Sequence, residues 1–542
     1  MNPNRFFEIK SKTLIIAFSL YFTLVLNLSF FRQVYTNIDI SSASGIILGI
    51  SFPIVLFLAL LLIFTLFLQP YLAKPLGVIV LLISSAANYW MFQYGVYIDA
   101  DMIRNVFETT PRESLDYFNL SIVLWVFFTG ILPALYLIKT RIVYAPFLSE
   151  AKMRGAIIGI ALVLVGLMAA LTYKEFSIFG RNHKDIVRLI NPTNYVYGTV
   201  RFFQKKIRAR QPFMALDPDS RYAPYRDPYK TVFVLLVGET ARAMNFSLNG
   251  YSKPTNPKLA QEDIVNFSDV TSCGTYTALS VPCIFSNLPR KEFNLNRAPY
   301  IENLVDLLRN NGYQIQWFDN DEGCKEVCKR VPTVYMTDLG NKKYCDKDYC
   351  YDEVFLEPLE TYLNNIQDNS FIVLHMMGSH GPSYYKRYPD AFARFTPTCY
   401  TGEVQNCDKN AIVNTYDNTI LYTDHVIAEV IRLLKKYPDY EIGLMYVSDH
   451  GESLGENNIY LHGIPYAVAP KEQTRVPMLL WMSSMMKKED HINYECLKEK
   501  SRDPISHDYI FHSLISLMEV RTKLYRPELD LFASCRTQPL PE

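Results

Sequence analysis

The stretch IGLMYVSDHGESLGE, residues 442–456, decides the fold of the C-terminal half of the chain. It opens with a short apolar run that includes β-branched side chains, which is typical of a strand buried on both faces. Asp449 and His450 follow this run after a single serine. A buried strand that ends in an acid and an imidazole predicts a functional site at the end of a sheet.

Two further apolar runs repeat this pattern. Residues 231–237 (TVFVLLV) lead directly to Glu239, and residues 371–374 (FIVL) lead to His380. Helical patterns separate the runs, so the order of elements predicts an α/β fold with a parallel sheet. Ligands of such sheets gather beyond the carboxyl ends of the strands. We therefore expect Glu239 and His380 to lie near the acid and the imidazole of the first stretch.

These strand ends supply the ligands of a predicted metal site. Glu239, Asp449 and His450 offer two carboxylates and an imidazole. Oxygen and nitrogen ligands of this kind suit Zn²⁺. An Asp-His pair alone is common in turns, but this pair follows one predicted buried strand and a Gly-Glu pair follows another. The sequence therefore predicts a zinc site, and the alternative is a set of ordinary turn residues.

A candidate nucleophile lies in the segment SCGTYTALSVPCIFS, residues 272–286. The segment is rich in hydroxyls, and a disulfide between its two cysteines would hold one of them in place. Coordination to a divalent cation would lower the pKa of that hydroxyl and make it an attacking group. The pattern leaves Thr275, Thr277 and Ser280 as candidates. The alternative is a rigid surface loop with solvated threonines.

Composition excludes two classes of protein. The 542 residues contain 54 Lys and Arg and 54 Asp and Glu, so the net charge is zero. A nucleic-acid-binding protein usually carries a basic footprint, so we expect no nucleic-acid partner. A disordered chain combines low hydrophobicity with high net charge, whereas 49% of these residues are hydrophobic.

The N-terminal third consists of long apolar runs. Each run is free of Asp, Glu, Lys and Arg and approaches the roughly 20 residues that cross a bilayer. The five runs are residues 13–31, 45–68, 75–94, 121–137 and 155–173. A cleaved signal peptide would explain the first run but not the other four, and helices of a soluble core rarely run so long without a charge. We therefore predict five membrane spans.

Basic residues near the spans predict the orientation in the membrane. Eight lie on the side of the N-terminus: Arg5, Lys10, Lys12, Lys74, Lys139, Arg141, Lys152 and Arg154. Three lie on the opposite side: Arg32, Arg104 and Arg112. The N-terminus is therefore expected in the cytoplasm, and everything after residue 173 outside it.

The cysteines indicate the same compartment independently. All ten lie between Cys273 and Cys535, an even number that is typical of disulfides in an oxidising compartment. Sequence does not fix the connectivity, and pairing of nearest neighbours is our hypothesis. The alternative is a structural zinc site, but the repeated Cys-x-x-Cys spacing of such sites is missing.

The polypeptide is expected to have three parts: a transmembrane domain (1–173), interfacial helices with a linker (174–230) and a catalytic domain (231–542). An outer loop, residues 96–120, places Asn105, Thr109 and Glu113 at helical spacing. These residues form either a solvated face or a polar pocket for a lipid headgroup. Within the connector, RFFQKKIRAR (201–210) suits an interfacial amphipathic helix, although an ordinary exposed helix fits equally well.

Six ordered motifs resemble the lipid A phosphoethanolamine transferase family of the alkaline phosphatase/sulfatase superfamily. They are VGETARAMNFSLNGY (237–251), SCGTYTALSVPCIFS (272–286), WFDNDEGCKEVC (317–328), HMMGSHGPSYYKRYP (375–389), VSDHGESLGE (447–456) and LHGIPY (461–466). The resemblance covers nearly the whole chain, including the five spans and the loop MIRNVFETTPRE (102–113). It implies a five-helix transmembrane bundle in the bacterial inner membrane and an alkaline-phosphatase-like, sulfatase-like α/β domain in the periplasm.

The resemblance also implies roles for particular residues. Thr277 matches the family nucleophile, and Glu239, Thr277, Asp449 and His450 match the ligands of one firmly bound Zn²⁺. His380 and His462 match histidines near the reacting phosphate that are also available to a second zinc. Lys325 matches a contact to the substrate phosphate, and Asn105 and Glu113 match contacts to the headgroup. Cysteines pair as nearest neighbours in the family, which supports our hypothesis.

The implied reaction moves phosphoethanolamine from phosphatidylethanolamine to a phosphate of lipid A through a phosphoethanolamine–threonine ester, in a membrane-bound enzyme expected to be a monomer. The alternative acceptor is another periplasmic glycan, either core heptose or glucan. A sulfatase is disfavoured because Cys-Ile-Phe at 283–285 replaces the start of the sulfatase motif C-x-P-x-R. A lipoteichoic-type polymerase lacks such dense cysteines, and a membrane sensor would not explain ligand-type residues at three strand ends.

Overall fold

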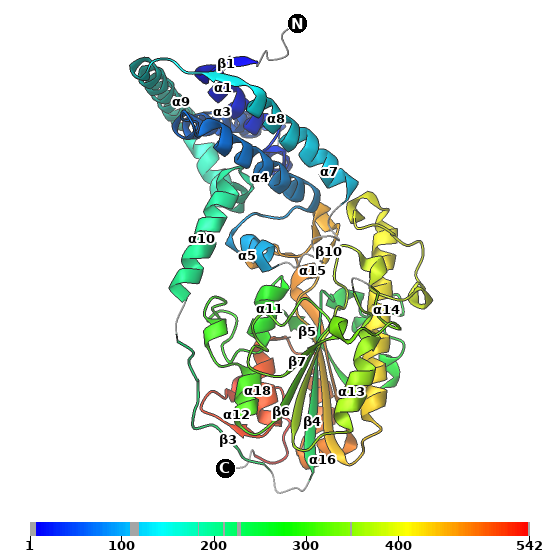
Figure 1. Ribbon diagram of the computed structural model, residues 1–542. Coiled ribbons are helices and arrows are strands. Elements are labelled where there is room, and N and C mark those ends of the chain that lie inside the picture. Colours follow the sequence, from blue (N-terminus) through cyan, green and yellow to red (C-terminus); the bar gives the residue numbers. More distant parts are fainter. Residues whose placement is uncertain are drawn as a thin grey trace. The chain divides into compact units, whose positions relative to one another are not determined.

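The computed structural model describes residues 7–38, 40–108, 119–182, 184–209, 212–224, 229–346 and 349–539 (Figure 1). The chain divides into two units: among the described residues, the first comprises residues 7–107 and 119–204, and the second comprises Glu108 and residues 205–539. The first unit is helical, and the second is built around one large sheet.

The first unit contains the predicted membrane spans. Its helices are α1 (Ser11–Leu24), α2 (Leu28–Thr36), α3 (Ala43–Phe67), α4 (Ala73–Tyr94), α5 (Ala100–Glu108), α7 (Leu120–Val126), the π-helical turn η1 (Phe127–Ile131), α8 (Leu132–Lys139) and α9 (Phe147–Asn182). Within the described residues, four helical segments are long and apolar enough to span a membrane, and α1 with α2 supplies a fifth if the bent pair is one span. The predicted N-terminal transmembrane bundle is therefore confirmed, with four to five candidate spans.

The first predicted span is bent rather than straight. Helices α1 and α2 meet at an angle of 47°. The buried side chain of Asn27 lies at the break, where its Nδ2 donates to the carbonyl of Phe22 at 2.9 Å and its Oδ1 accepts the backbone N–H of Asn191 at 2.8 Å. Asn191 in turn donates to the carbonyl of Leu26 at 2.7 Å. These bonds satisfy backbone groups that the break would otherwise expose to an apolar surrounding.

A buried ion pair ties α9 to α1 and α3. Arg154 Nε lies 3.0 Å from Glu150 Oε1, and its guanidinium also donates to the carbonyls of Thr65 and Leu68 at the end of α3. Ser11 donates to the other oxygen of Glu150 at 2.9 Å. The start of α9, the end of α3 and the start of α1 therefore lie together at one end of the unit.

The second unit is organised by an eight-stranded sheet in the order β13-β5-β12-β9-β4-β8-β6-β7. Its strands are β4 (Lys230–Gly238), β5 (Ile264–Thr271), β6 (Gln314–Asp319), β7 (Thr333–Tyr335), β8 (Ser370–His375), β9 (Tyr440–Ser448), β12 (Arg475–Met482) and β13 (Ile505–Ser506). The three predicted strands are the central β8, β4 and β9, which pair in parallel as expected. The complete sheet is mixed, because β12 is antiparallel to both of its neighbours.

Helices cover both faces of this sheet (Figure 1). One face carries α11 (Thr277–Ile284), α12 (Leu304–Asn310) and α18 (Asp508–Leu517), and the other carries α13 (Leu356–Leu363) and α14 (Lys409–Leu434). Strand β4 alternates between the two cores: Phe233 packs into the first core and Val234 into the second. Since both faces are buried, the central strands read as continuous apolar runs.

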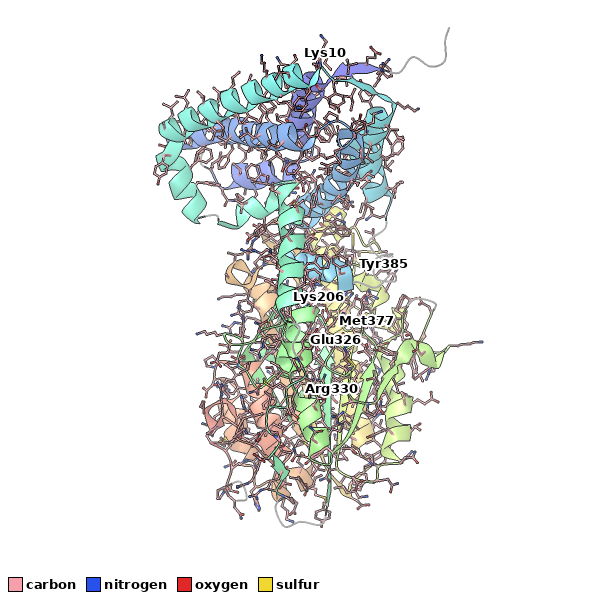
Figure 2. The ribbon with its side chains drawn as sticks, turned by 60° about the vertical axis from the view of Figure 1, so that its left-hand side comes forward. Lys10, Lys206, Glu326, Arg330, Met377 and Tyr385 are labelled. Carbon is pink, nitrogen blue, oxygen red and sulfur yellow. A yellow bond between two sulfur atoms is a disulfide. The ribbon has the colours of Figure 1, made fainter. Side chains whose placement is uncertain are left out.

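The connection between the sheet and the spans is partly helical. Helix α10 (Thr193–Ala209) includes most of the predicted interfacial segment, with Phe202 buried and Lys206 exposed (Figure 2). Beyond it, the short strand β3 (Arg221–Tyr222) pairs with β14 (Val520–Arg521).

All ten cysteines are paired, and the prediction of nearest-neighbour disulfides is confirmed. The pairs are Cys273–Cys283, Cys324–Cys328, Cys345–Cys350, Cys399–Cys407 and Cys496–Cys535.

Candidate active site and metal centre

The ends of β4 and β9 bring three predicted ligands together. Glu239 follows β4, Asp449 and His450 follow β9, and the backbone N–H of Asp449 donates to the carbonyl of Gly238 at 2.9 Å. The potential ligand atoms of the three side chains lie within 4.8 Å of one another. His450 Nε2 is 3.4 Å from Glu239 Oε1 and 3.3 Å from Asp449 Oδ2.

The electrostatics of this cluster fit a bound cation. All three side chains are fully buried, and Glu239 Oε1 and Asp449 Oδ2 have no hydrogen-bond partner among the described residues. Burial raises the pKa of both carboxyl groups, and the charge of Asp449 raises the pKa of Glu239 further. Burial lowers the pKa of His450 well below its usual value, so its imidazole is neutral. Two adjacent buried carboxylates need a positive partner, and a neutral imidazole completes a donor set that suits zinc.

Thr277 is the hydroxyl that faces this cluster. It is the first residue of α11, and its Oγ1 lies 3.1 Å from Glu239 Oε2 and 3.4 Å from His450 Nε2. Thr275 instead donates to the carbonyl of Ile464 at 2.8 Å. Neither Thr275 nor the buried Ser280 shows a hydrogen bond to the cluster. The structure thus separates three hydroxyls that the sequence pattern left equivalent.

His380 and His462 stand beside the cluster. The ring centroids of His450 and His462 are 4.5 Å apart, and those of His380 and His462 are 6.2 Å apart. Burial lowers the pKa of His380 to about 3, even though the nearby charge of Asp321 acts in the opposite direction. His380 is therefore a neutral imidazole, which can accept a proton or a metal at one ring nitrogen.

Glu452 is a functional candidate that sequence reasoning missed. It is completely buried, and both carboxylate oxygens are used: Oε2 lies 2.8 Å from His462 Nδ1, and Oε1 accepts the hydroxyl of Tyr384. A carboxylate at Nδ1 fixes the tautomer and orientation of a histidine, so Glu452 positions the ring of His462 beside the cluster. The only sequence signal was the acid two residues after His450.

A second buried network, also missed, lies at the ends of β6 and β8. His375 Nδ1 is 3.1 Å from Asp319 Oδ2, and His375 Nε2 is 3.6 Å from Asp321 Oδ2. Burial lowers the pKa of His375, but the charge and hydrogen bond of Asp319 outweigh burial, so the pKa is raised. Trp317 Nε1 also donates to Asp319 at 2.9 Å. The WFDND motif therefore holds the loop that leads to Lys325.

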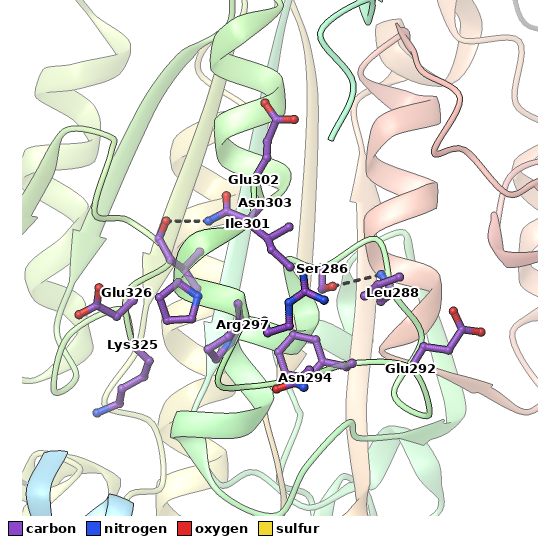
Figure 3. A pocket seen from close by; sticks show the side chains of 15 residues that line it. Ser286, Leu288, Glu292, Asn294, Arg297, Ile301, Glu302, Asn303, Lys325 and Glu326 are labelled. Atoms are coloured by element: carbon purple, nitrogen blue, oxygen red, sulfur yellow. Dashed lines mark hydrogen bonds between the residues drawn. The ribbon is translucent and has the colours of Figure 1, made fainter. Parts of the chain in front are cut away.

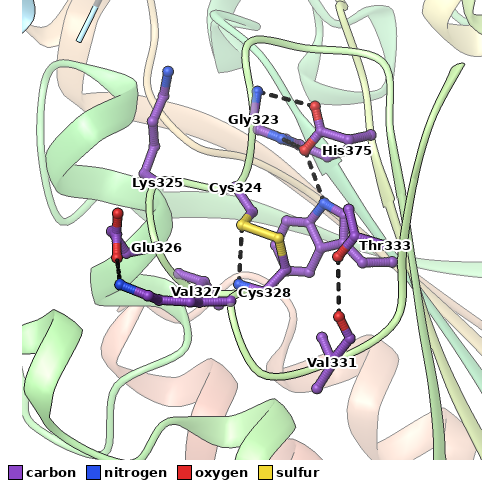
Figure 4. The surroundings of a disulfide bond; sticks show 12 residues. Gly323, Cys324, Lys325, Glu326, Val327, Cys328, Val331, Thr333 and His375 are labelled. Carbon is purple, nitrogen blue, oxygen red and sulfur yellow. Dashed lines mark hydrogen bonds and ion pairs between the residues drawn. A yellow bond between two sulfur atoms is a disulfide. The ribbon is translucent and has the colours of Figure 1, made fainter. Parts of the chain in front are cut away.

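Lys325 lies in a five-residue loop closed by the disulfide Cys324–Cys328 (Figure 4). Its backbone adopts φ 48°, a left-handed conformation that non-glycine residues rarely occupy. The closed loop supports this backbone conformation, and Lys325 Nζ donates to the carbonyl of Glu322 at 3.2 Å. Lys325 also borders a cavity of about 190 Å³ that Ser286 and Arg297 line from the other side (Figure 3). The positive charge of Lys325 contributes to the lowered pKa of His380.

The two predicted headgroup contacts belong to the outer loop. Asn105 lies on α5, half-buried, in the first unit. Glu113 lies outside the described residues. Their role stays a prediction.

This fold and site define a class of protein. A doubly covered sheet with acid and histidine ligands at the strand ends, joined to a bundle of membrane spans, is typical of a membrane-anchored enzyme of the alkaline phosphatase/sulfatase type. The sulfatase family model matches residues 231–520, and a second family model, phosphoethanolamine transferase EptA/EptB, matches residues 56–207.

The chain belongs to the phosphoethanolamine transferase family. It is 41% identical to the phosphoethanolamine transferase EptA of Escherichia coli K12 over 95% of both chains. It is 36% identical to the phosphatidylethanolamine transferase Mcr-1 of Escherichia coli, over 86% of this chain and 89% of the relative. Among solved structures, the integral membrane protein EptA of Neisseria meningitidis matches with a TM-score of 0.95 and 38% identity, over 98% of this chain and 99% of that one.

Membership settles the enzyme class and the location. The chain is a phosphoethanolamine transferase anchored in the bacterial inner membrane by its N-terminal spans, with its C-terminal domain in the periplasm. The predicted fold class, enzyme class and localisation are thereby confirmed.

Proposed function

We propose that the enzyme transfers phosphoethanolamine from phosphatidylethanolamine to a phosphate of lipid A, through a phosphoethanolamine ester of Thr277. The observation that carries this proposal is the position of Thr277 Oγ1, within hydrogen-bond reach of Glu239 Oε2 and next to His450 Nε2. The name of the Neisseria relative, lipooligosaccharide phosphoethanolamine transferase A, supports an acceptor of this class. A 28% identical relative of Escherichia coli is named for transfer to Kdo(2)-lipid A.

Zinc would be held by Glu239, Thr277, Asp449 and His450. The unpartnered oxygens of Glu239 and Asp449 support this donor set. When bound, zinc would lower the pKa of the Thr277 hydroxyl and offset the negative charge of the phosphate. A second zinc would take imidazole nitrogens of His380 and His462. The proton transfer described below belongs to the enzyme with one zinc, in which His462 Nε2 binds no metal.

In the first step, Thr277 Oγ1 forms a bond to the donor phosphorus, and the bond from phosphorus to the diacylglycerol oxygen breaks. Glu239 Oε2, 3.1 Å away, is placed to take the hydroxyl proton. The departing oxygen needs a proton, and we assign this proton to His462 Nε2 because Glu452 holds the opposite nitrogen. Burial lowers the pKa of His380 and keeps its imidazole neutral. His380 therefore suits a contact to the reacting phosphate better than proton donation.

In the second step, an oxygen of the lipid A phosphate attacks the phosphorus of the Thr277 ester, the bond from phosphorus to Thr277 Oγ1 breaks, and Glu239 returns the proton to this oxygen. The acceptor phosphate gives its own proton to His462, which restores the enzyme. This two-step scheme is ping-pong, because diacylglycerol departs before the acceptor reacts. Lys325 would pair with the substrate phosphate. Asn105 and Glu113 would contact the ethanolamine headgroup at the membrane surface.

Mass spectrometry of lipid A from cells that produce matched variants tests this function. Thr277→Val and Thr275→Val remove a hydroxyl from the same loop without a large change of shape. We expect phosphoethanolamine on lipid A with the wild type and with Thr275→Val, and none with Thr277→Val.

Two results would contradict the proposal. Modification by Thr277→Val at the wild-type level would remove Thr277 from the reaction. Phosphoethanolamine found only on core heptose or glucan, with lipid A unmodified, would establish the alternative acceptor.

A further inference from the structure

A second candidate site lies in the first unit, far along the sequence from the catalytic motifs. A cavity of about 610 Å³ opens between the turn that joins α3 to α4 and the segment that follows α8. We call it the basic pocket; its lining residues are Pro70, Tyr71, Lys74, Arg141, Ile142 and Tyr144. These described residues include two cations and no acid.

Contacts within the unit assign the basic pocket to a side of the membrane. Lys74 Nζ donates to the carbonyl of Ile138 at 2.8 Å, so the start of α4 lies beside the end of α8. The buried pair of Glu150 and Arg154 brings the start of α9 to the same end. Helix α9 runs from there towards the segment that enters the periplasmic domain, so the basic pocket faces the cytoplasm.

Tyr71 supports a binding role. Its backbone adopts φ 68°, and its side chain is 98% exposed. Non-glycine residues rarely adopt this strained conformation, and such residues cluster at ligand-binding positions. Tyr71 lines the basic pocket together with Lys74, and tyrosine at the membrane surface commonly sits among lipid headgroups.

The cations of the basic pocket are available to an anion. Arg141 Nη1 lies 3.2 Å from Glu8 Oε1, but both side chains are mostly exposed, at 71% and 58%. Exposed ion pairs contribute little to stability, so a phosphate can share or replace Glu8. The guanidinium also offers a planar pair of donors that matches phosphate oxygens. Glu8 and Arg141 belong to the paired strands β1 (Glu8–Lys10) and β2 (Arg141–Val143), which fix the position of Arg141 (Figure 1).

We propose that the basic pocket binds the phosphate headgroup of an anionic phospholipid from the cytoplasmic leaflet. Charge favours an anion, and a lining of aromatic and apolar side chains at the end of the spans favours a lipid over free phosphate. This site is separate from the transfer reaction, whose donor and acceptor react at the periplasmic domain.

Native mass spectrometry of the full-length protein tests the site. Delipidated protein is titrated with phosphatidylglycerol, with phosphatidylcholine and with inorganic phosphate. The variant Lys74→Gln with Arg141→Gln is compared with Lys139→Gln with Lys152→Gln, which removes the same charge from exposed positions near the same end. We expect the affinity for phosphatidylglycerol to fall by roughly 25-fold in the first variant, about fivefold for each cation, and by less than about threefold in the second.

A third variant guards against loss of folding. Glycine accepts positive φ without strain, so Tyr71→Gly should melt no lower than the wild type and still bind phosphatidylglycerol more weakly. Equal losses in both charge variants, equal binding of phosphatidylcholine, or full displacement of the lipid by inorganic phosphate would each overturn the proposal.

Discussion

The substitution Glu452→Gln tests the assignment of His462 as proton donor. Glu452 is completely buried, and its two oxygens accept from His462 Nδ1 and from the hydroxyl of Tyr384. Glutamine keeps the shape but offers only one acceptor oxygen. One buried donor is then unpaired, which costs about 1–3 kcal/mol, and His462 loses the partner that sets its tautomer. We expect transfer from phosphatidylethanolamine to slow by about 10- to 100-fold.

The choice of donor separates proton donation from a merely structural role. The alkoxide of diacylglycerol is a poor leaving group, so its departure needs a proton from the enzyme. Nitrophenolate, released from a nitrophenyl ester of phosphoethanolamine, is a good leaving group and departs without a proton. The rate of Glu452→Gln should therefore approach the wild-type rate with the nitrophenyl ester. The matched control is Glu441→Gln, which changes a buried carboxylate at the opposite end of β9 and should leave both rates within about twofold.

The assay follows release of a fluorescent diacylglycerol and of nitrophenolate from purified full-length protein, with metal content and melting temperature measured in parallel. If Glu452→Gln slows both donors by the same factor, His462 is not the proton donor. If it slows neither donor, Glu452 does not position a reacting group.

Three further outcomes follow from buried charges and cross-links. Arg154→Leu leaves Glu150 as an unpaired buried charge, so the free energy of unfolding in detergent should fall by about 3–5 kcal/mol. A melting temperature like that of the wild type would contradict this expectation. Replacing Cys496 and Cys535 by serine opens a loop of 39 residues, and the domain should lose about 4 kcal/mol of stability; a loss below about 1 kcal/mol would contradict it. In chelator-treated protein, burial raises the pKa of Asp449 above its unfolded value, so its contribution to stability is present at low pH and is lost as pH rises through the folded pKa of about 7. Between about pH 4 and pH 7, metal-free wild type should therefore lose stability relative to Asp449→Asn. Added zinc should remove this loss from the wild type and stabilise it more than Asp449→Asn, which lacks a proposed ligand. Parallel pH profiles of the two metal-free proteins would contradict the assignment.

The fold was predictable where local patterns carry the information. Strands β4, β8 and β9 are buried on both faces, and their sequences are therefore continuous apolar runs that can be recognised without a structure. The direction of β12 was not predictable, because an antiparallel strand buried on both faces has the same pattern as a parallel one. The break after α1 depends on Asn27 and Asn191, which are 164 positions apart.

The residues of the candidate site also fall into two groups: those that local sequence patterns predict, and those whose role depends on how the chain folds. Glu239, Asp449 and His450 follow strands directly, so the parallel order alone brings them together. The choice of Thr277 over Thr275 needed the path of the loop, because both residues have the same type and lie two positions apart. The role of Glu452 depends on the loop between it and His462, which folds back so that the two side chains meet. The spacing of the two residues in the sequence does not predict this contact.

The central claim is that Thr277 carries phosphoethanolamine during turnover. Purified enzyme is incubated with phosphatidylethanolamine without acceptor, quenched in acid, digested and examined by peptide mass spectrometry. We predict one added phosphoethanolamine on the peptide of residues 272–286, assigned by fragmentation to Thr277 and lost when lipid A is added before quenching. An adduct on another residue, or an adduct that persists in the presence of lipid A, would contradict the account.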